Sequence, residues 1–262
     1  MSTVIRMSRF RSVSLAELRL FGRNRTAMFS ALAIPLILAV AVSSAGIEEG
    51  GVPVAAIVVT SLLGYVLLAA VYYNLVTTYV TRREDLVLKR LRAGELSDGE
   101  ILTGIATPMV AVALAQMVVF VVLGAVLFGL PVPVNALVLV AGALGGVVVF
   151  VLLAAVSTEF TRTTESAQVT TLPVMLACLI GSMIYSSLDD APEIVVAALR
   201  ALPLTPVVDL MRLGWLGTTG EPDPVGFTEV FGEALVPAGI LAAWIVVCLI
   251  AVRRRFRWEP RR

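Results

Sequence analysis

The residues that could carry out chemistry are few, and their types exclude most kinds of catalysis. The 262-residue sequence contains no histidine, which excludes Ser-His-Asp and Cys-His nucleophilic sites and zinc sites with histidine ligands. No segment fits the G-x-x-x-x-G-K-[ST] loop that cradles nucleotide phosphates. We therefore expect no catalytic residue, no metal site and no cofactor in this chain, so that any ATP chemistry belongs to a partner.

The two cysteines and one close acidic pair have simpler explanations than a reaction centre. Cys178 and Cys248 lie inside apolar runs, where a thiol behaves as a small hydrophobic group. Asp189 and Asp190 are adjacent, but no base, nucleophile or metal ligand accompanies them. Solvated loop charge explains this pair better than a membrane enzyme does.

The elements that must position any functional residue are predicted to be membrane-spanning helices. Hydrophobic residues make up 58% of the chain and charged residues 15%, and the mean hydropathy is +0.94. Since a hydrocarbon core needs about 20 residues, each of six uncharged runs can cross a bilayer. We expect an all-α polytopic membrane protein whose six transmembrane helices are Ala27–Ala45, Val52–Val80, Ile101–Leu130, Val134–Thr158, Gln168–Leu188 and Ala234–Val252. In the fourth, Gly142-x-x-x-Gly146 allows close helix approach, either within one bundle or at a dimer seam.

The basic residues lie mostly on one side of these spans. Of the twenty lysines and arginines, eighteen fall on the side that carries both termini, and only Arg200 and Arg212 fall on the other. Because cytoplasmic loops are rich in lysine and arginine, we expect both termini in the cytoplasm of a multi-pass protein of the cell membrane. The chain then divides into a cytoplasmic tail (1–26), a six-span membrane domain (27–252) and a basic cytoplasmic tail (253–262).

A short amphipathic helix is expected before the first span. Ser14, followed by Glu17, forms a capping-box pattern. The next residues place leucines and Phe21 on one side and arginines, among them Arg23, on another. Such a helix lies in the inner interface of the bilayer, where it either anchors the topology or also contacts a cytoplasmic partner.

The cytoplasmic segment between the second and third spans is predicted to hold a crosswise helix over residues 82–93. Asp85 and Lys89 stand four residues apart, as do Glu84 and Leu88, which is helical spacing. The apolar edge of this helix, with Leu91 on it, has no core of its own to enter. We therefore expect this edge to dock on another protein.

Two long spans would hold this crosswise helix below the membrane. The second and third apolar runs contain 29 and 30 residues and, at about 1.5 Å per residue, exceed the roughly 30 Å hydrocarbon core. The third begins at a second capping box, formed by Ser97 and Glu100.

The extracellular segment 189–233 is predicted to contain two short helices. The first starts near Pro192 and ends before Pro203, and the second starts at Thr205 and ends near Gly214 or Gly217. Both are too short to cross the membrane, but their residues are largely apolar. We expect a re-entrant pair that dips into the outer leaflet.

Polar groups within the spans are sparse, and three tyrosines repeat at regular spacing. Tyr65, Tyr72 and Tyr79 are seven residues apart, which places them on one face of an α-helix. This face either lines a cavity for an amphiphilic ligand, or the tyrosines pack between helices and anchor the interface.

The spans contain no ionisable group of the kind that carriers driven by protons or sodium keep near the middle of the bilayer. We infer that energy for transport comes from outside the chain. The crosswise cytoplasmic helix is where a motor could act.

Three stretches resemble bacterial type-2 ATP-binding-cassette (ABC) exporter permeases of the daunorubicin-resistance-like branch. RREDLVLKRLRAGELSDGEILTG resembles their coupling segment, and LAELRLFGRNRTAMFSALAIPLIL their connecting helix and first span. APEIVVAALRALPLTPVVDLMRLGWLG resembles the motif between their last two spans. Leu86 departs from the pattern, since many relatives have glycine there. The first span also lacks the L-G-x-x-W pattern of glycan and teichoic-acid exporters.

The resemblance implies a dimer, with a second copy or a paralogue, bound to two cytoplasmic ATPase subunits that hold ATP and Mg; it implies no nucleic-acid partner. The implied ATPase-coupling residues are Glu84, Asp85, Leu88, Lys89, Leu91 and Arg92, with Glu17 and Arg23 from the amphipathic helix. The implied substrate cleft lies between the second and fifth spans, with Tyr65, Tyr72, Thr171, Met175 and Tyr185.

The function expected is export of hydrophobic or amphiphilic small molecules, of the drug or antibiotic type. One alternative keeps the fold and changes the cargo to lipid, lipid-linked glycan or peptide. Another is a sensor or immunity component that binds a ligand and signals without moving anything.

Overall fold

The computed structural model describes residues 54–94, 96–184, 192–219, 223–256 and 258. The predicted first span, the amphipathic helix with Glu17 and Arg23, and the cleft residue Tyr185 lie outside this part of the chain. Every regular element within it is helical. The helices are α3 (Val54–Val66), η1 (Leu67–Tyr73), α4 (Asn74–Glu84), α5 (Val87–Arg92), α6 (Asp98–Phe128), α7 (Ala136–Ser157), α8 (Ser166–Ile184), α9 (Glu193–Arg200), α10 (Thr205–Leu216), α11 (Val230–Glu233) and α12 (Leu235–Arg255).

Five of the described helical segments are long and apolar enough to cross a membrane, or six if the bent pair α9 and α10 is counted as one. They correspond to the second through sixth predicted spans, which confirms an all-helical, multi-span protein. α3, η1 and α4 form one segment over Ala56–Glu84, and α6 is 31 residues long. The predicted capping box of Ser97 and Glu100 starts α6, with Ser97 N–H donating to Glu100 Oε2 at 2.8 Å.

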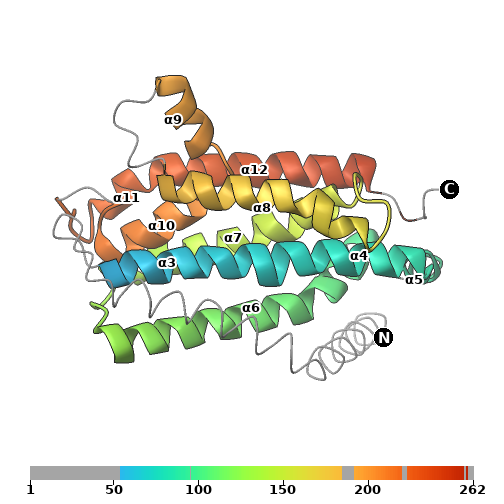
Figure 1. Ribbon diagram of the computed structural model, residues 1–262, viewed down its shortest axis with the longest axis horizontal. Helices are drawn as coiled ribbons and strands as arrows, with labels where there is room; N and C mark the ends of the chain where they lie inside the picture. The colour runs from blue at the N-terminus through green and yellow to red at the C-terminus, as the bar shows by residue number, and fades with distance from the viewer. Residues whose placement is uncertain (1–53, 95, 185–191, 220–222, 257, 259–262) are drawn as a thin grey trace.

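The long helices lie side by side along the long axis of the molecule (Figure 1). One end of the bundle, which we call the α5 end, holds α5, the end of α7, the start of α8 and the end of α12. The opposite end, which we call the α10 end, holds the end of α6, the start of α7 and the C-terminus of α10. Successive spans therefore alternate in direction.

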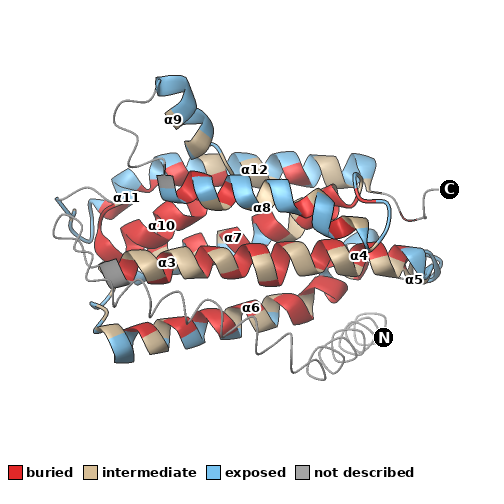
Figure 2. Cartoon of the chain, in the orientation of Figure 1, coloured by how far each residue is buried: buried red, intermediate tan, exposed pale blue. Residues whose placement is uncertain are grey.

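The helix α10 lies inside the bundle, and all twelve of its residues are buried, whereas α9 has no buried residue (Figure 2). The two helices meet at 81°. Their bounds agree with the two short helices predicted from proline and glycine, and α10 ends at Gly217, whose φ of 73° suits glycine. Because every residue of α10 is buried, this short helix is stabilised mainly by its packing against the other helices.

Small residues allow α10 to approach α7 closely. A Cβ atom on Gly142 would lie 2.7 Å from Leu210 Cβ, and one on Gly146 would lie 2.7 Å from Val207 Cγ1. A Cβ atom on Gly214 of α10 would lie 2.3 Å from the backbone nitrogen of Leu139. The predicted close approach at the glycines of the fourth span thus occurs within one bundle, against a short helix.

Candidate coupling and substrate sites

The chain turns sharply between α4 and α5, at Leu86. Leu86 has φ 59° and ψ 14°, the left-handed conformation that favours glycine. It is also the position where the permeases that this sequence resembles often carry glycine. The expected single helix over 82–93 is therefore wrong: α4 ends at Glu84, and α5 begins at Val87. Because the helix breaks, the pairs Asp85 with Lys89 and Glu84 with Leu88 do not share one helical face.

The apolar edge of α5 does have a core to enter, contrary to the expectation from sequence. Leu88 is fully buried, and Leu91 is partly buried against the same hydrophobic core. Residues after α12 contribute to this core, since Trp258 is also buried there and stacks edge-on with Phe256 at 4.9 Å between ring centroids. Leu88 is thus a core residue and is not available for docking.

The polar side of α5 remains accessible. Asp85, Lys89, Arg90 and Arg92 are exposed, and Leu86 exposes 40% of its surface. Arg92 Nε lies 3.3 Å from Asp98 Oδ1, and its guanidinium carbon lies 5.0 Å from the centre of the Trp258 ring. Both members of the ion pair are about half exposed, so the pair contributes little to stability. We call the exposed residues Asp85, Leu86, Lys89, Arg90 and Arg92 the crossbar surface.

Glu84 points away from this surface and toward the connection between α7 and α8. Its Oε2 accepts hydrogen bonds from Thr164 Oγ1 at 2.5 Å and from Thr164 N–H at 3.3 Å. Glu84 therefore links two segments of the same chain in this structure.

Two of the three repeating tyrosines are buried between helices. Tyr72 Oη lies 3.0 Å from Ser157 Oγ of α7, and its ring packs edge-on against Phe150 at 6.2 Å. Tyr79 Oη donates to the Leu102 carbonyl at 2.9 Å. Of the two explanations left open by the sequence, packing between helices fits both residues.

The seven-residue repeat fails because of η1, which follows Tyr65 and contains Tyr72. A π-helix closes its hydrogen bonds from i to i+5, so each residue advances the face by less than in an α-helix. Tyr65, which is only half buried, and Tyr72 consequently do not share the face that α-helical spacing predicts.

Two further predicted cleft residues, Thr171 and Met175, lie on α8 within the described part of the chain. Thr171 is buried and donates to the Ala167 carbonyl of its own helix at 2.8 Å. Met175 is half buried against the core.

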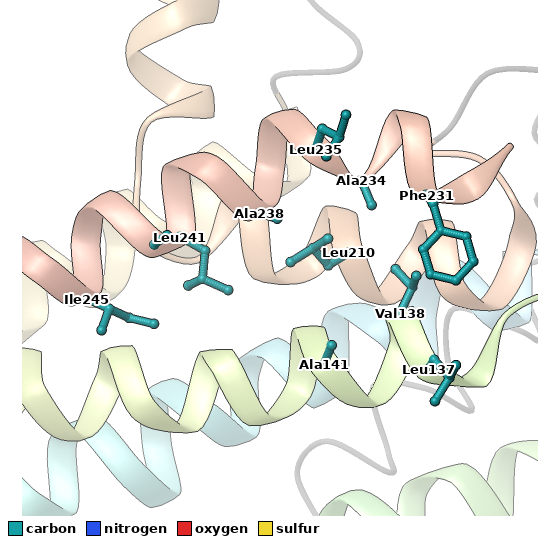
Figure 3. Close-up of a pocket in the computed structure, with 11 residues that line it drawn as sticks. Leu137, Val138, Ala141, Leu210, Phe231, Ala234, Leu235, Ala238, Leu241 and Ile245 are labelled. Atoms are coloured by element: carbon teal, nitrogen blue, oxygen red, sulfur yellow. The ribbon is translucent and has the colours of Figure 1, made fainter. Parts of the chain in front are cut away.

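An apolar groove lies elsewhere, between α7, α10 and the pair α11 and α12, in the half of the bundle nearer the α10 end. Its volume is about 430 Å³, and none of the predicted cleft residues lines it (Figure 3). The lining residues are Leu137, Val138, Ala141, Leu210, Phe231, Ala234, Leu235, Ala238, Leu241, Ala242 and Ile245.

Sequence reasoning missed this groove because alanine has no functional group that would mark a binding site. The pattern that could have indicated the groove is the spacing of Ala234, Ala238 and Ala242, which places a stripe of small residues along one face of the last span. The groove forms where this stripe faces Ala141 of α7.

Two charged residues of α10 are buried inside the bundle. Asp209 and Arg212 expose 8% and 5% of their surfaces, and Arg212 Nη2 donates to Ser61 Oγ of α3 at 3.2 Å. The sequence analysis placed both residues in the extracellular segment 189–233, so its statement that the six spans contain no ionisable group did not cover them. The absence of charge cannot then serve as the argument for an external energy source.

Comparison with known proteins gives a separate reason to expect that the energy for transport comes from a partner. Residues 26–254 match the family described as ABC-2 family transporter protein. The chain belongs to this family. No curated protein and no solved structure matches it. Membership makes this ABC-2 permease a multi-pass membrane component of an ABC transporter, a role that is generally non-catalytic and that implies an ABC ATPase subunit as partner.

Proposed function

We propose that this ABC-2 permease is the transmembrane subunit of an ATP-driven exporter for hydrophobic or amphiphilic small molecules of the drug or antibiotic type. The observation that carries the proposal is the position of α5. This short helix connects the end of the 29-residue segment Ala56–Glu84 to α6, which has 31 residues. Because both are longer than the hydrocarbon core of a bilayer, α5 can project beyond that core to meet a partner.

The distribution of basic residues supports a cytoplasmic location for the α5 end. Arg82, Lys89 and Arg90 lie there, together with Arg162 and the three arginines that end α12. By the positive-inside rule, this end faces the cytoplasm of a bacterial cell, and both termini lie on the same side. The α10 end then faces outward, and α9 and α10 form the re-entrant pair.

The assembly that we propose contains two permease chains, identical or paralogous, and two ATPase subunits that bind ATP and Mg. ATP-driven closure of the ATPases would push on the crossbar surface. The amphipathic segment with Glu17 and Arg23 is a second proposed contact with the ATPase.

The apolar groove supports a hydrophobic cargo. Its eleven lining residues are all apolar, so they favour hydrocarbon or aromatic groups over charged ones. The cleft between the second and fifth spans, with Tyr65 and Met175, is proposed as the route that opens during the transport cycle. The same apolar lining fits an acyl chain, which makes lipid export the second candidate function.

Co-purification of the permease with its ATPase tests the proposal. The double variant Lys89→Glu, Arg90→Glu reverses two charges on the crossbar surface and should lose the ATPase, because a charged rim residue contributes to recognition through complementary potentials. Arg200→Glu, at the far end of the bundle, is the matched control and should retain the ATPase.

Vesicles that contain the purified complex then test transport. We expect ATP-dependent accumulation of a lipophilic dye, and none from the permease alone. Accumulation by the permease alone, driven by a pH or sodium gradient, would contradict the proposal, while ligand-stimulated ATP hydrolysis without flux would favour a sensor.

A further inference from the structure

A buried arginine connects the end of α4, next to α5, to the segment between α7 and α8. Arg83, in the last turn of α4, exposes 1% of its surface. Its Nη1 donates to the Thr158 carbonyl at 2.9 Å, and its Nη2 donates to the carbonyls of Thr161 at 2.5 Å and Arg162 at 3.4 Å. All three acceptors belong to the connection between α7 and α8, which we call the 158–165 connection.

One of these acceptors, the carbonyl of Thr158, belongs to the C-cap of α7, and the other two belong to the segment that follows it. α7 ends at Ser157, and the last carbonyls of a helix carry partial negative charge and lack intrahelical donors. The guanidinium of Arg83 supplies a charged fork of donors at this point, and charge-assisted hydrogen bonds are stronger than neutral ones. Arg83 thus caps the C-terminus of α7 from another element.

Two neighbours of Arg83 contact the same connection. Glu84 Oε2 accepts from Thr164, as described above, and Thr81 Oγ1 lies 3.0 Å from Thr164 Oγ1. The last turn of α4 therefore holds the 158–165 connection along its length, from Thr158 to Thr164. Figure 1 shows the start of α8 beside α4 at this end of the bundle.

The contact lies directly next to the turn into α5. Leu86, the residue with positive φ, donates its N–H to the Arg83 carbonyl at 3.1 Å. A force applied to α5 enters α4 at this turn, so it reaches Arg83 before any residue deeper in the span.

We propose that Arg83 is a positioning residue that makes the 158–165 connection move as one body with α5. When the ATPase moves α5, the motion would pass to α4 and α6 through the covalent chain. It would also pass to α7 and α8 through the hydrogen bonds of Arg83. The inference rests on the proposed function, because it takes the ATPase to act on α5. It adds the fourth and fifth spans to the elements that this motion drives directly.

Pulsed electron–electron resonance on the permease–ATPase complex in nanodiscs tests this proposal. Spin labels replace Ala93, at the C-cap of α5, and Glu165 on the connection, both exposed and both outside the crossbar surface, in a background in which Cys178 and Cys248 are alanine. A second label pair joins Ala93 to Arg254, at the end of α12. Between the nucleotide-free and vanadate-trapped states we expect an unchanged 93–165 distance and a shifted 93–254 distance.

Arg83→Gln should broaden the 93–165 distance and make it depend on nucleotide. Arg83→Lys should restore the distance only in part, because an ammonium lacks the planar fork that reaches several carbonyls. Arg162→Gln is the matched control, since it removes a charge from the same connection but an exposed one, and should behave as wild type. Arg83→Lys also serves as the milder variant if Arg83→Gln does not fold.

A 93–165 distance that changes with nucleotide in the wild-type complex would overturn the proposal. So would an unchanged, nucleotide-independent distance in folded Arg83→Gln; if that variant does not fold, the same result in Arg83→Lys would overturn it. If no ATPase associates with the permease, both this inference and the proposed function fail. The two failures are distinguishable, because in the first cases the 93–254 distance still responds to nucleotide.

Discussion

Single polar side chains fix the helices of this bundle at a few buried points. Asn135, fully buried at the start of α7, accepts from the N–H groups of Leu137 and Val138 and donates to the Phe227 carbonyl at 3.1 Å. Trp215 donates from Nε1 to the Pro131 carbonyl at 2.9 Å. Buried polar groups need such partners because an unmade hydrogen bond in an apolar medium is costly. These bonds set where α10 and α7 sit relative to each other.

Leu88 and Lys89 are neighbours with different roles, which stability measurements separate. Leu88→Ala should lower the free energy of unfolding by about 2–5 kcal/mol, because it leaves a cavity at a fully buried site. Lys89→Ala, at an exposed site, should leave the thermal unfolding midpoint in detergent unchanged and weaken ATPase co-purification. A stable Leu88→Ala variant that lost the ATPase would instead make Leu88 a docking residue.

At the scale of elements, α10 is the unusual part of this permease. It is a twelve-residue helix enclosed by α3, α7, α8 and α12, and it brings Asp209 and Arg212 into the bundle. The hydrogen bond from Arg212 to Ser61 ties it to the second span. An outward opening of that span therefore requires α10 to move with it or to release it.

The fit of α10 against α7 depends on Gly214. Gly214→Ala should destabilise the protein by about 1–3 kcal/mol, because the new methyl group would meet the backbone of Leu139, which cannot move aside as a side chain can. Gly239→Ala on α12 is the control, since a Cβ atom there meets nothing within 4 Å. Equal thermal midpoints for the two variants would show that α10 does not pack as described.

The role of the groove between α7 and α12 in binding cargo can also be tested at the scale of elements. Ala238→Phe should fill it and reduce ATP-dependent uptake of a lipophilic dye into vesicles, without loss of the folded protein. Ala243→Phe, on an exposed part of the same helix and outside the groove, should leave uptake unchanged. Equal uptake by both variants would remove the groove from the cargo route.

At the scale of the whole molecule, the outward faces are apolar where a water-soluble protein would be polar. Large exposed hydrophobic side chains lie along α6, α8 and α12, including Val126 and Val169, each 75% exposed. Such a surface is stable against lipid or against another membrane chain. Figure 2 shows exposed residues along α8 and α12, while α10 is buried.

The proposed orientation in the membrane predicts which residues a reagent can reach. In a background without Cys178 and Cys248, Arg90→Cys should resist a membrane-impermeant maleimide on intact cells and react after permeabilisation. Glu233→Cys, at the α10 end, should react on intact cells. The reverse pattern would place α5 outside and contradict the proposed coupling role.

Much of the fold could be predicted because each element is set by its own sequence. The bounds of α9 and α10 follow from Pro192, Pro203 and Gly217, and the start of α6 follows from Ser97 and Glu100. The candidate sites could be predicted only in part. Leu88 is chemically indistinguishable from a docking leucine, and the positions of Tyr65 and Tyr72 depend on the π-helical segment.

By itself, the sequence determined that the chain is helical, that several helices are long enough to span a bilayer, and where the charges lie along it. These properties depend on local composition and periodicity, which a single sequence contains. Only the tertiary structure decided that α10 enters the bundle, that Leu88 is in the core, and that Arg83 caps α7. Burial and capping depend on which distant segments meet, and nothing local to Arg83 or Leu88 encodes that meeting.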